Sequence, residues 1–127
     1  MPKAMRIRRR PMSPRLYKMP PPMSEKDWQA QVVQLAGTFG WMVQHSRPSQ
    51  VGDQGRWVTA ITGDVGFPDL VLAHRTKGVV FAELKTETGR MATAQTQWRD
   101  TLAGHVEWYL WRPSDIAAVM RRLSRAV

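Results

Sequence analysis

The 127-residue chain contains no cysteine and no apolar run long enough to cross a bilayer. Without cysteine, disulfide bonds and thiolate zinc sites are excluded, and the composition fits a reducing compartment such as the cytoplasm. A transmembrane helix needs about 18 or more consecutive apolar residues, so none is predicted and no membrane partner is expected. The basic N-terminus also lacks the apolar stretch of a secretory signal peptide.

Acidic residues are missing from the first 23 positions. This segment holds seven of the 19 Lys and Arg residues and six of the nine prolines. The remainder carries twelve basic and ten acidic groups, so the formal charge of +9 is concentrated at the N-terminus. Proline and arginine without apolar periodicity predict a flexible arm over residues 1–23. Clustered positive charge favours a nucleic-acid partner, and the lack of an amphipathic repeat disfavours a membrane surface.

Residues 24–127 predict one α/β domain with the element order α-β-β-β-α-β-α. Ser24 caps a first helix that ends before Gly40, and a strand follows over 41–45. Residues 47–67 are rich in Gly, Pro, Ser and Asp and predict a long loop. The later elements are strands at 69–73 and 79–85, a helix at 93–103 capped by Thr93, a strand at 106–111 and a helix from Pro113.

Two details of these elements bear on packing. Apolar residues on both faces of the strand at 79–85 predict a central strand that is covered on both sides. In the last helix, the spacing predicts an inward face of Ile116, Val119, Met120 and Leu123. The basic residues of that helix are expected on its solvated face; these are Arg121, Arg122 and Arg125.

Two acidic residues interrupt otherwise apolar strands. Asp69 opens the first strand of the predicted hairpin, and Glu83 lies near the end of the second. Burying an unpaired carboxylate is costly, so such residues need a partner. If the turn pairs Ala73 with Val79, the antiparallel register sets Asp69 opposite Glu83, with Cβ atoms about 4.5–5.5 Å apart. A slip of two residues would instead oppose Asp69 to Lys85.

This pairing makes a divalent metal one candidate for the missing partner. Two ionised carboxylates at that separation repel each other, and one tends to take up a proton. A hard divalent cation removes the conflict because it accepts oxygen atoms from both. The alternative is an ordinary solvated end of a strand.

The residues around the two acids form a longer pattern. It comprises Gly66-Phe67-Pro68-Asp69-Leu70, Phe81-Ala82-Glu83-Leu84-Lys85, Gly89-Arg90-Met91, Gln95 and Trp98. The pattern resembles the PD-(D/E)xK nuclease superfamily, and within it the VRR-Nuc domains of phage and bacterial proteins and of eukaryotic Fanconi-associated nucleases. The resemblance covers residues 24–127. It implies a restriction-endonuclease-like central mixed sheet flanked by helices.

The resemblance also implies roles for individual residues. Asp69 and Glu83 would ligate Mg²⁺ or Mn²⁺, and Lys85 would position or help to deprotonate the attacking water. Gln95, at the start of the following helix, would support the site. Glu25 matches the acid that many members carry on the first helix, which makes it the candidate third ligand. A bound metal lowers the pKa of its water and neutralises phosphate oxygens, as phosphodiester hydrolysis requires.

Basic and aromatic residues outside the hairpin are the expected DNA contacts. Arg90 precedes the helix at 93–103, and helix N-termini with nearby arginines bind phosphates, so Arg90 is expected either to contact the substrate or to lie in a solvated loop. Trp57, beside Arg56 in the predicted loop, is expected either to stack on an unpaired base or to anchor the loop. Three arginines of the arm are expected to neutralise phosphates; these are Arg8, Arg9 and Arg10.

These features and the resemblance together predict a metal-dependent DNA endonuclease. Selection of branched DNA is what the resemblance implies, because stand-alone domains of this type resemble the Holliday-junction resolvases of DNA repair and recombination. The resemblance implies a homodimer, whose two-fold symmetry would bring two sites to two strands. It also implies the cytoplasm of a bacterium or of a phage-infected cell. One alternative is a non-catalytic nucleic-acid-binding module on a nuclease fold. Another is a general or restriction-type nuclease of the same superfamily.

Overall fold

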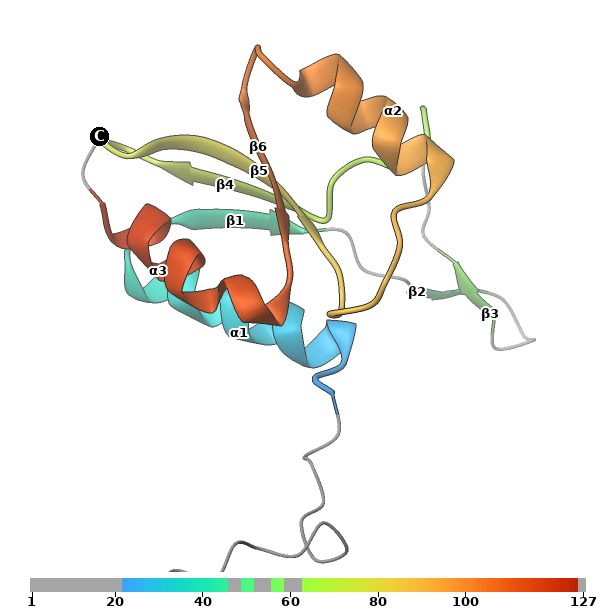
Figure 1. The fold of residues 1–127 in the computed structure, drawn as a ribbon, viewed down its shortest axis with the longest axis horizontal. Helices are drawn as coiled ribbons and strands as arrows, with labels where there is room; N and C mark the ends of the chain where they lie inside the picture. The colour runs from blue at the N-terminus through green and yellow to red at the C-terminus, as the bar shows by residue number, and fades with distance from the viewer. Residues whose placement is uncertain (1–21, 46–48, 52–55, 59–62, 126–127) are drawn as a thin grey trace, which may run out of the picture.

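A four-stranded mixed sheet forms the centre of the protein. The structure is a computed structural model that describes residues 22–45 and 63–125, together with the backbone of 49–51 and 56–58. The strand order is β1-β4-β5-β6, comprising Met42–His45, Leu70–His74, Gly78–Leu84 and Glu107–Trp111. β1, β4 and β5 are antiparallel, whereas β6 runs parallel to β5. The predicted mixed sheet flanked by helices is confirmed (Figure 1).

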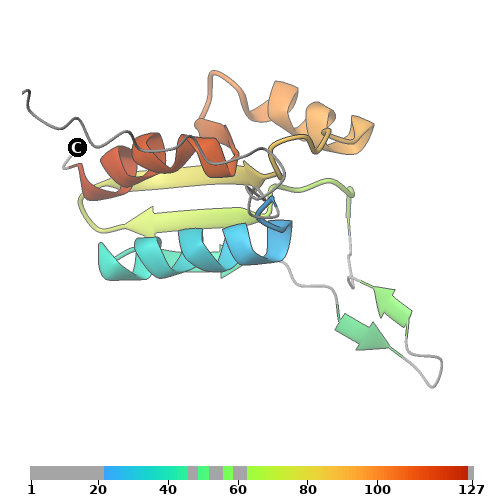
Figure 2. The same ribbon diagram turned by 60° about the horizontal axis from the view of Figure 1, so that its bottom comes forward.

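Helices α1 (Glu25–Thr38) and α3 (Ile116–Ser124) cover one face of this sheet. They run side by side along the strands in Figure 2. The predicted cap is present, because the Ser24 side chain accepts a hydrogen bond from the Asp27 N–H at 3.1 Å. The core between helices and sheet is apolar: Trp28, Val32, Ala36, Trp41, Leu70, Leu72, Val80, Ala82, Leu84, Trp111, Val119 and Leu123.

Two core tryptophans tie distant parts of the chain together. The Trp28 indole N–H donates to the Trp111 carbonyl at 3.0 Å, and that of Trp41 donates to the Leu123 carbonyl at 2.9 Å. A buried indole needs such a partner, since an unpaired N–H in an apolar environment is destabilising. The first bond holds the start of α1 against the end of β6, where the acidic hairpin also ends.

Helix α2 (Thr93–Leu102) lies on the opposite face of the sheet, where it reaches only one end (Figure 1). The expectation that β5 is covered on both sides is therefore wrong for its first half. Val79 is 49% exposed, and Met42, on the same face of β1, is 79% exposed. β5 is nevertheless central, as predicted. An apolar run shows what a strand can bury, but a single short helix leaves part of this face open to solvent.

The predicted loop at 47–67 contains two short antiparallel strands, β2 (Ser49–Val51) and β3 (Arg56–Val58), which form a separate two-stranded sheet. The predicted element order therefore lacks one strand pair. Three-residue strands are too short to show the alternation of apolar and polar residues that predicts longer ones.

The last helix departs from its predicted faces at two positions. Met120, expected inward, is exposed, whereas Arg122, expected outward, is only 4% exposed. Arg122 donates through Nε and Nη2 to the Glu107 carboxylate at 2.7 and 3.0 Å, and its guanidinium carbon lies 5.2 Å from the centre of the Trp41 ring. An arginine can therefore occupy an inward position because β6 supplies its counter-charge. Within the described ranges, every helix is too short or too polar to cross a membrane.

Candidate active site

The hairpin of β4 and β5 brings the two acids together. Val71 pairs with Phe81, and Ala73 pairs with Val79, which confirms the predicted register and excludes the two-residue slip. Asp69 directly precedes β4, so the same register sets it opposite Glu83. The Leu84 backbone N–H donates to Asp69 Oδ2 at 2.8 Å and fixes the orientation of that carboxylate.

Glu83 is the buried member of the pair. Its side chain is 1% exposed, and its pKa is raised from 4.5 to about 8. Burial is the largest cause, because desolvation disfavours the ionised form. Repulsion from the Asp69 carboxylate and a hydrogen bond with it raise the pKa further, while the nearby Lys85 ammonium lowers it. The two acids therefore share a site in which both cannot ionise easily without an added positive charge.

Lys85 and Gln95 complete the immediate surroundings of Glu83. Lys85 Nζ lies 3.9 Å from Glu83 Oε1, and the Gln95 side-chain amide donates to the same oxygen at 2.8 Å. Gln95 Oε1 also accepts the Ala92 backbone N–H at 2.8 Å, so one side chain both caps α2 and orients Glu83. The predicted cap at Thr93 is wrong, because the N-cap residue is Ala92.

Gly66 allows α2 to approach this site. Its φ of +91° favours glycine, and a Cβ atom built there would lie 2.5 Å from the Ala94 backbone carbon. A side chain would therefore push the first turn of α2 away from the loop that carries Pro68 and Asp69. Since Gln95 belongs to that turn, Gly66 sets the position of the amide that binds Glu83.

Arg112 holds the loop that follows Lys85, a role that the sequence did not reveal. Its Nη1 group donates to the Thr86 carbonyl and, at 2.8 Å, to the Gly89 carbonyl. The Lys85 N–H donates to the Trp111 carbonyl at 3.1 Å. The end of β6 thus fixes the backbone of Lys85 itself and of the loop that follows it. No local signal could have predicted this, because the carbonyl acceptors lie about 25 residues away in the chain.

The other predicted site residues lie farther out or beyond the described part. Arg90 is exposed in the loop before α2, where it is free to reach a ligand. Arg56 and Trp57 form part of β3, but their side chains lie outside the described structure. The arm residues lie outside the described residues altogether; these are Arg8, Arg9 and Arg10.

Glu25 lies near enough to influence Glu83 but does not form a three-acid cluster with Asp69 and Glu83. It is exposed on the first turn of α1, and its charge is the smallest of the influences that raise the pKa of Glu83. Among the residues that the structure describes, no group of three or more His, Cys, Asp or Glu side chains is placed to hold a metal ion. The structure therefore assembles two of the three predicted ligands.

The chemistry of the two assembled acids fits a divalent cation. Both donors are hard oxygen atoms, which suit Mg²⁺ and Mn²⁺. The pKa of Glu83 is raised by its burial and then by repulsion from Asp69, and a bound cation would offset both effects. Comparisons with models of protein families, with curated proteins and with solved structures found no match. The resemblance to VRR-Nuc nucleases therefore depends on the sequence pattern around Asp69 and Glu83 alone.

Proposed function

We propose that the protein is a metal-dependent DNA endonuclease whose active site is the acidic hairpin. One observation carries the proposal: Asp69 and the buried Glu83 oppose each other at the end of a sheet, with Lys85 beside them. An unpaired charge in such a position is destabilising, so a purely structural role gives no reason for a second acid. Two oxygen donors can bind a divalent metal, and a cationic side chain beside them can stabilise the negative charge that develops on a phosphodiester during hydrolysis.

Asp69 and Glu83 would hold Mg²⁺ or Mn²⁺. When bound, the metal supplies a water of lowered pKa and neutralises charge on the phosphate. Lys85 contributes a positive charge that attracts the phosphate and stabilises the negative charge of the pentacovalent state. Gln95 keeps Glu83 Oε1 in place, and the Leu84 N–H does the same for the Asp69 carboxylate. These fixed partners reduce the reorganisation that the site needs before reaction.

The substrate that we propose is branched DNA. The resemblance to Holliday-junction resolvases supports this choice, and the excess positive charge of residues 1–23 supports a polyanionic partner. A homodimer would present two hairpins to two strands of a junction. Arg90 lies on the exposed loop that Arg112 fixes, where it can contact a phosphate next to the cut.

The test is a cleavage panel with linear, flapped, single-stranded and four-way DNA, each with Mg²⁺, Mn²⁺ or excess chelator. We expect metal-dependent nicking that is fastest on branched substrates. Lys85→Ala should lose this cutting and keep its DNA binding, whereas Lys26→Ala, which changes an exposed lysine of α1, should cut normally. Cutting that persists in chelator or in Lys85→Ala would refute the mechanism. Metal-independent DNA binding without cutting would favour the non-catalytic module.

A further inference from the structure

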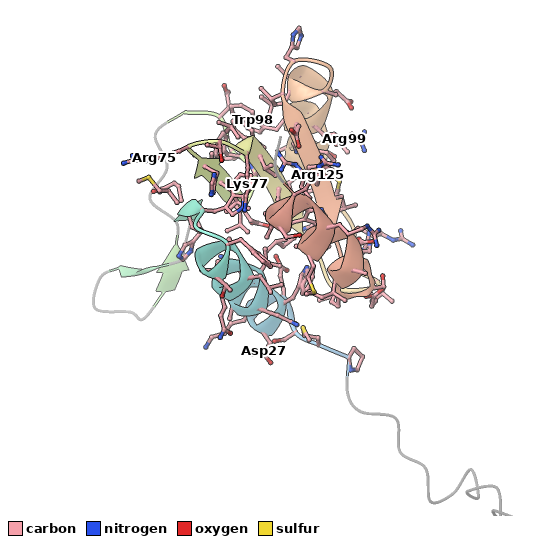
Figure 3. All side chains as sticks on the ribbon, turned by 90° about the vertical axis from the view of Figure 1, so that its left-hand side faces the viewer. Asp27, Arg75, Lys77, Trp98, Arg99 and Arg125 are labelled. Atoms are coloured by element: carbon pink, nitrogen blue, oxygen red, sulfur yellow. The ribbon has the colours of Figure 1, made fainter. Side chains whose placement is uncertain are left out.

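An aromatic cluster is built from residues that adjoin the two acids in the chain, because Phe67 precedes Asp69 and Phe81 precedes Glu83 by two residues. The Phe67 ring makes edge-to-face contacts with Phe81 and Trp98, at centroid distances of 6.1 and 5.0 Å and interplanar angles of 80° and 89°. The Trp98 indole N–H donates to the Val65 carbonyl at 3.0 Å, which ties α2 to the same loop. Figure 3 shows Trp98 on the α2 side of the sheet, away from Asp27 on α1. The Phe67 ring is therefore held from two sides.

Phe67 is nevertheless 42% exposed, and Val65, two residues before it, is also exposed. An aromatic ring that is already fixed in orientation loses little further entropy when another ring stacks on it. Phe67 also precedes Asp69 by two residues, so at most about 7 Å of extended chain separates them. The exposed ring is thus within reach of the nucleotide next to a phosphate bound at Asp69 and Glu83.

A hollow of about 480 Å³ borders the cluster between the 63–67 loop and α2. It is lined by Asp64, Val65, Gln97, Trp98, Asp100 and Thr101. Two carboxylates repel a phosphate, but carboxylates and amides accept hydrogen bonds from the amino groups of bases. Asp100 already accepts one bond from Arg99 at 2.9 Å, and a carboxylate retains further acceptor capacity. The lining therefore suits a nucleobase and disfavours the DNA backbone.

A base inside a duplex is stacked between its neighbours and cannot present its face to Phe67. We propose that Phe67 is a stacking platform for an unpaired base next to the scissile phosphate, with the adjoining hollow receiving its polar edge. The inference depends on the proposed nuclease function. It names the feature that the site selects, which is a nucleotide outside a duplex, as in single strands, flaps and branch points.

The experiment places 2-aminopurine in the single-stranded part of a flapped duplex, with Ca²⁺ as the only divalent cation. Stacking on Phe67 should quench its fluorescence in the wild-type protein. Phe67→Leu keeps the apolar contacts with Phe81 and Trp98 but removes the ring. It should abolish the quenching and weaken binding of the flapped DNA about fivefold or more, with binding of plain duplex unchanged. Phe67→Tyr should restore both signals.

Phe39→Leu is the matched control, because Phe39 is a partly buried ring at the far end of α1. It should behave as wild type. Equal binding of both DNAs by Phe67→Leu and wild type would overturn the inference, as would an equal loss for both DNAs. A change in oligomeric state without a change in DNA preference would assign the ring to a protein interface instead.

Cleavage of the same DNAs with Mn²⁺ separates this inference from the proposed function. If wild type and Phe67→Leu cut flapped and duplex DNA in the same ratio, the stacking role is wrong and the nuclease stands. If nothing is cut but quenching occurs in wild type alone, the nuclease is wrong, and Phe67 stacks on an unpaired base in a protein that binds DNA without cutting it. If wild type shows neither quenching nor cutting, both are wrong.

Discussion

The raised pKa of Glu83 predicts how the stability of the metal-free protein depends on pH. The unfolded chain releases this proton near pH 4.5, whereas the folded protein retains it up to about pH 8. The folded state therefore binds more protons between these values, so the free energy of unfolding falls as the pH rises through them. A rise from 4.5 to about 8 corresponds to a loss of about 5 kcal/mol. That loss is a large part of the stability of a small domain.

Glu83→Gln isolates this effect. The substitution keeps the side-chain oxygen that accepts the Gln95 amide but removes the titrating proton. Above pH 8 in chelator, we expect Glu83→Gln to be more stable than wild type by about 2–5 kcal/mol, with no advantage below pH 4.5. Denaturant unfolding at closely spaced pH values measures the difference. At pH 8, Mn²⁺ should raise the free energy of unfolding of the wild-type protein but not that of Glu83→Gln.

The control is Asp27→Asn, which alters an exposed acid of α1. Its free energy of unfolding should change with pH in the same way as that of wild type. If the free energy of unfolding of Glu83→Gln also changes with pH as that of wild type does from pH 4.5 to 8.5, then Glu83 does not hold a proton in the folded protein. The inferred conflict with Asp69 would then be wrong.

Two further predictions concern packing around the site, and denaturant midpoints measure both. Gly66→Ala should destabilise the protein by more than Gly104→Ala and should slow DNA cutting, because both residues have positive φ but only Gly66 faces a backbone atom at 2.5 Å. A conformational cost of about 1 kcal/mol is expected for Gly104→Ala, and equal effects would contradict the role given to Gly66. Arg122→Ala should cost about 1–3 kcal/mol, since it removes a buried side chain that packs on Trp41 and donates to Glu107 and the Lys77 carbonyl, whereas the exposed Arg121→Ala should change stability by less than about 0.5 kcal/mol. Similar losses in these two arginine variants would refute the role given to the buried Arg122 side chain.

Much of the fold follows from local signals. Ser24 and Gly40 mark the limits of α1 to within two residues, and the turn between Ala73 and Val79 fixes the register that opposes the two acids. Such signals succeed because caps and turns depend on residues that are close in sequence. The exposed half of the sheet could not be predicted in this way, because it depends on how far α2 extends over β5.

The features of the candidate site likewise fall into those that local sequence signals predict and those that depend on distant segments of the chain. Asp69 and Glu83 come together through the hairpin, and the Gln95 contact agrees with the motif. The contacts of Arg112 and the exposure of Phe67 depend on segments that meet only in three dimensions. Arg122 shows the limit most clearly: helix periodicity assigns a charged residue to solvent unless a distant partner, here Glu107, is known.

The most direct test of the metal-dependent active site compares Asp69→Asn with Asp27→Asn in single-turnover cleavage of four-way DNA with Mn²⁺. Asparagine retains an oxygen that can accept the Leu84 N–H, so the fold should survive, while the charge opposite Glu83 is lost. We expect Asp69→Asn to bind the DNA and to leave it uncut, with Asp27→Asn cutting at the wild-type rate. Cutting by Asp69→Asn at the wild-type rate would contradict the assignment of the acidic hairpin as the active site.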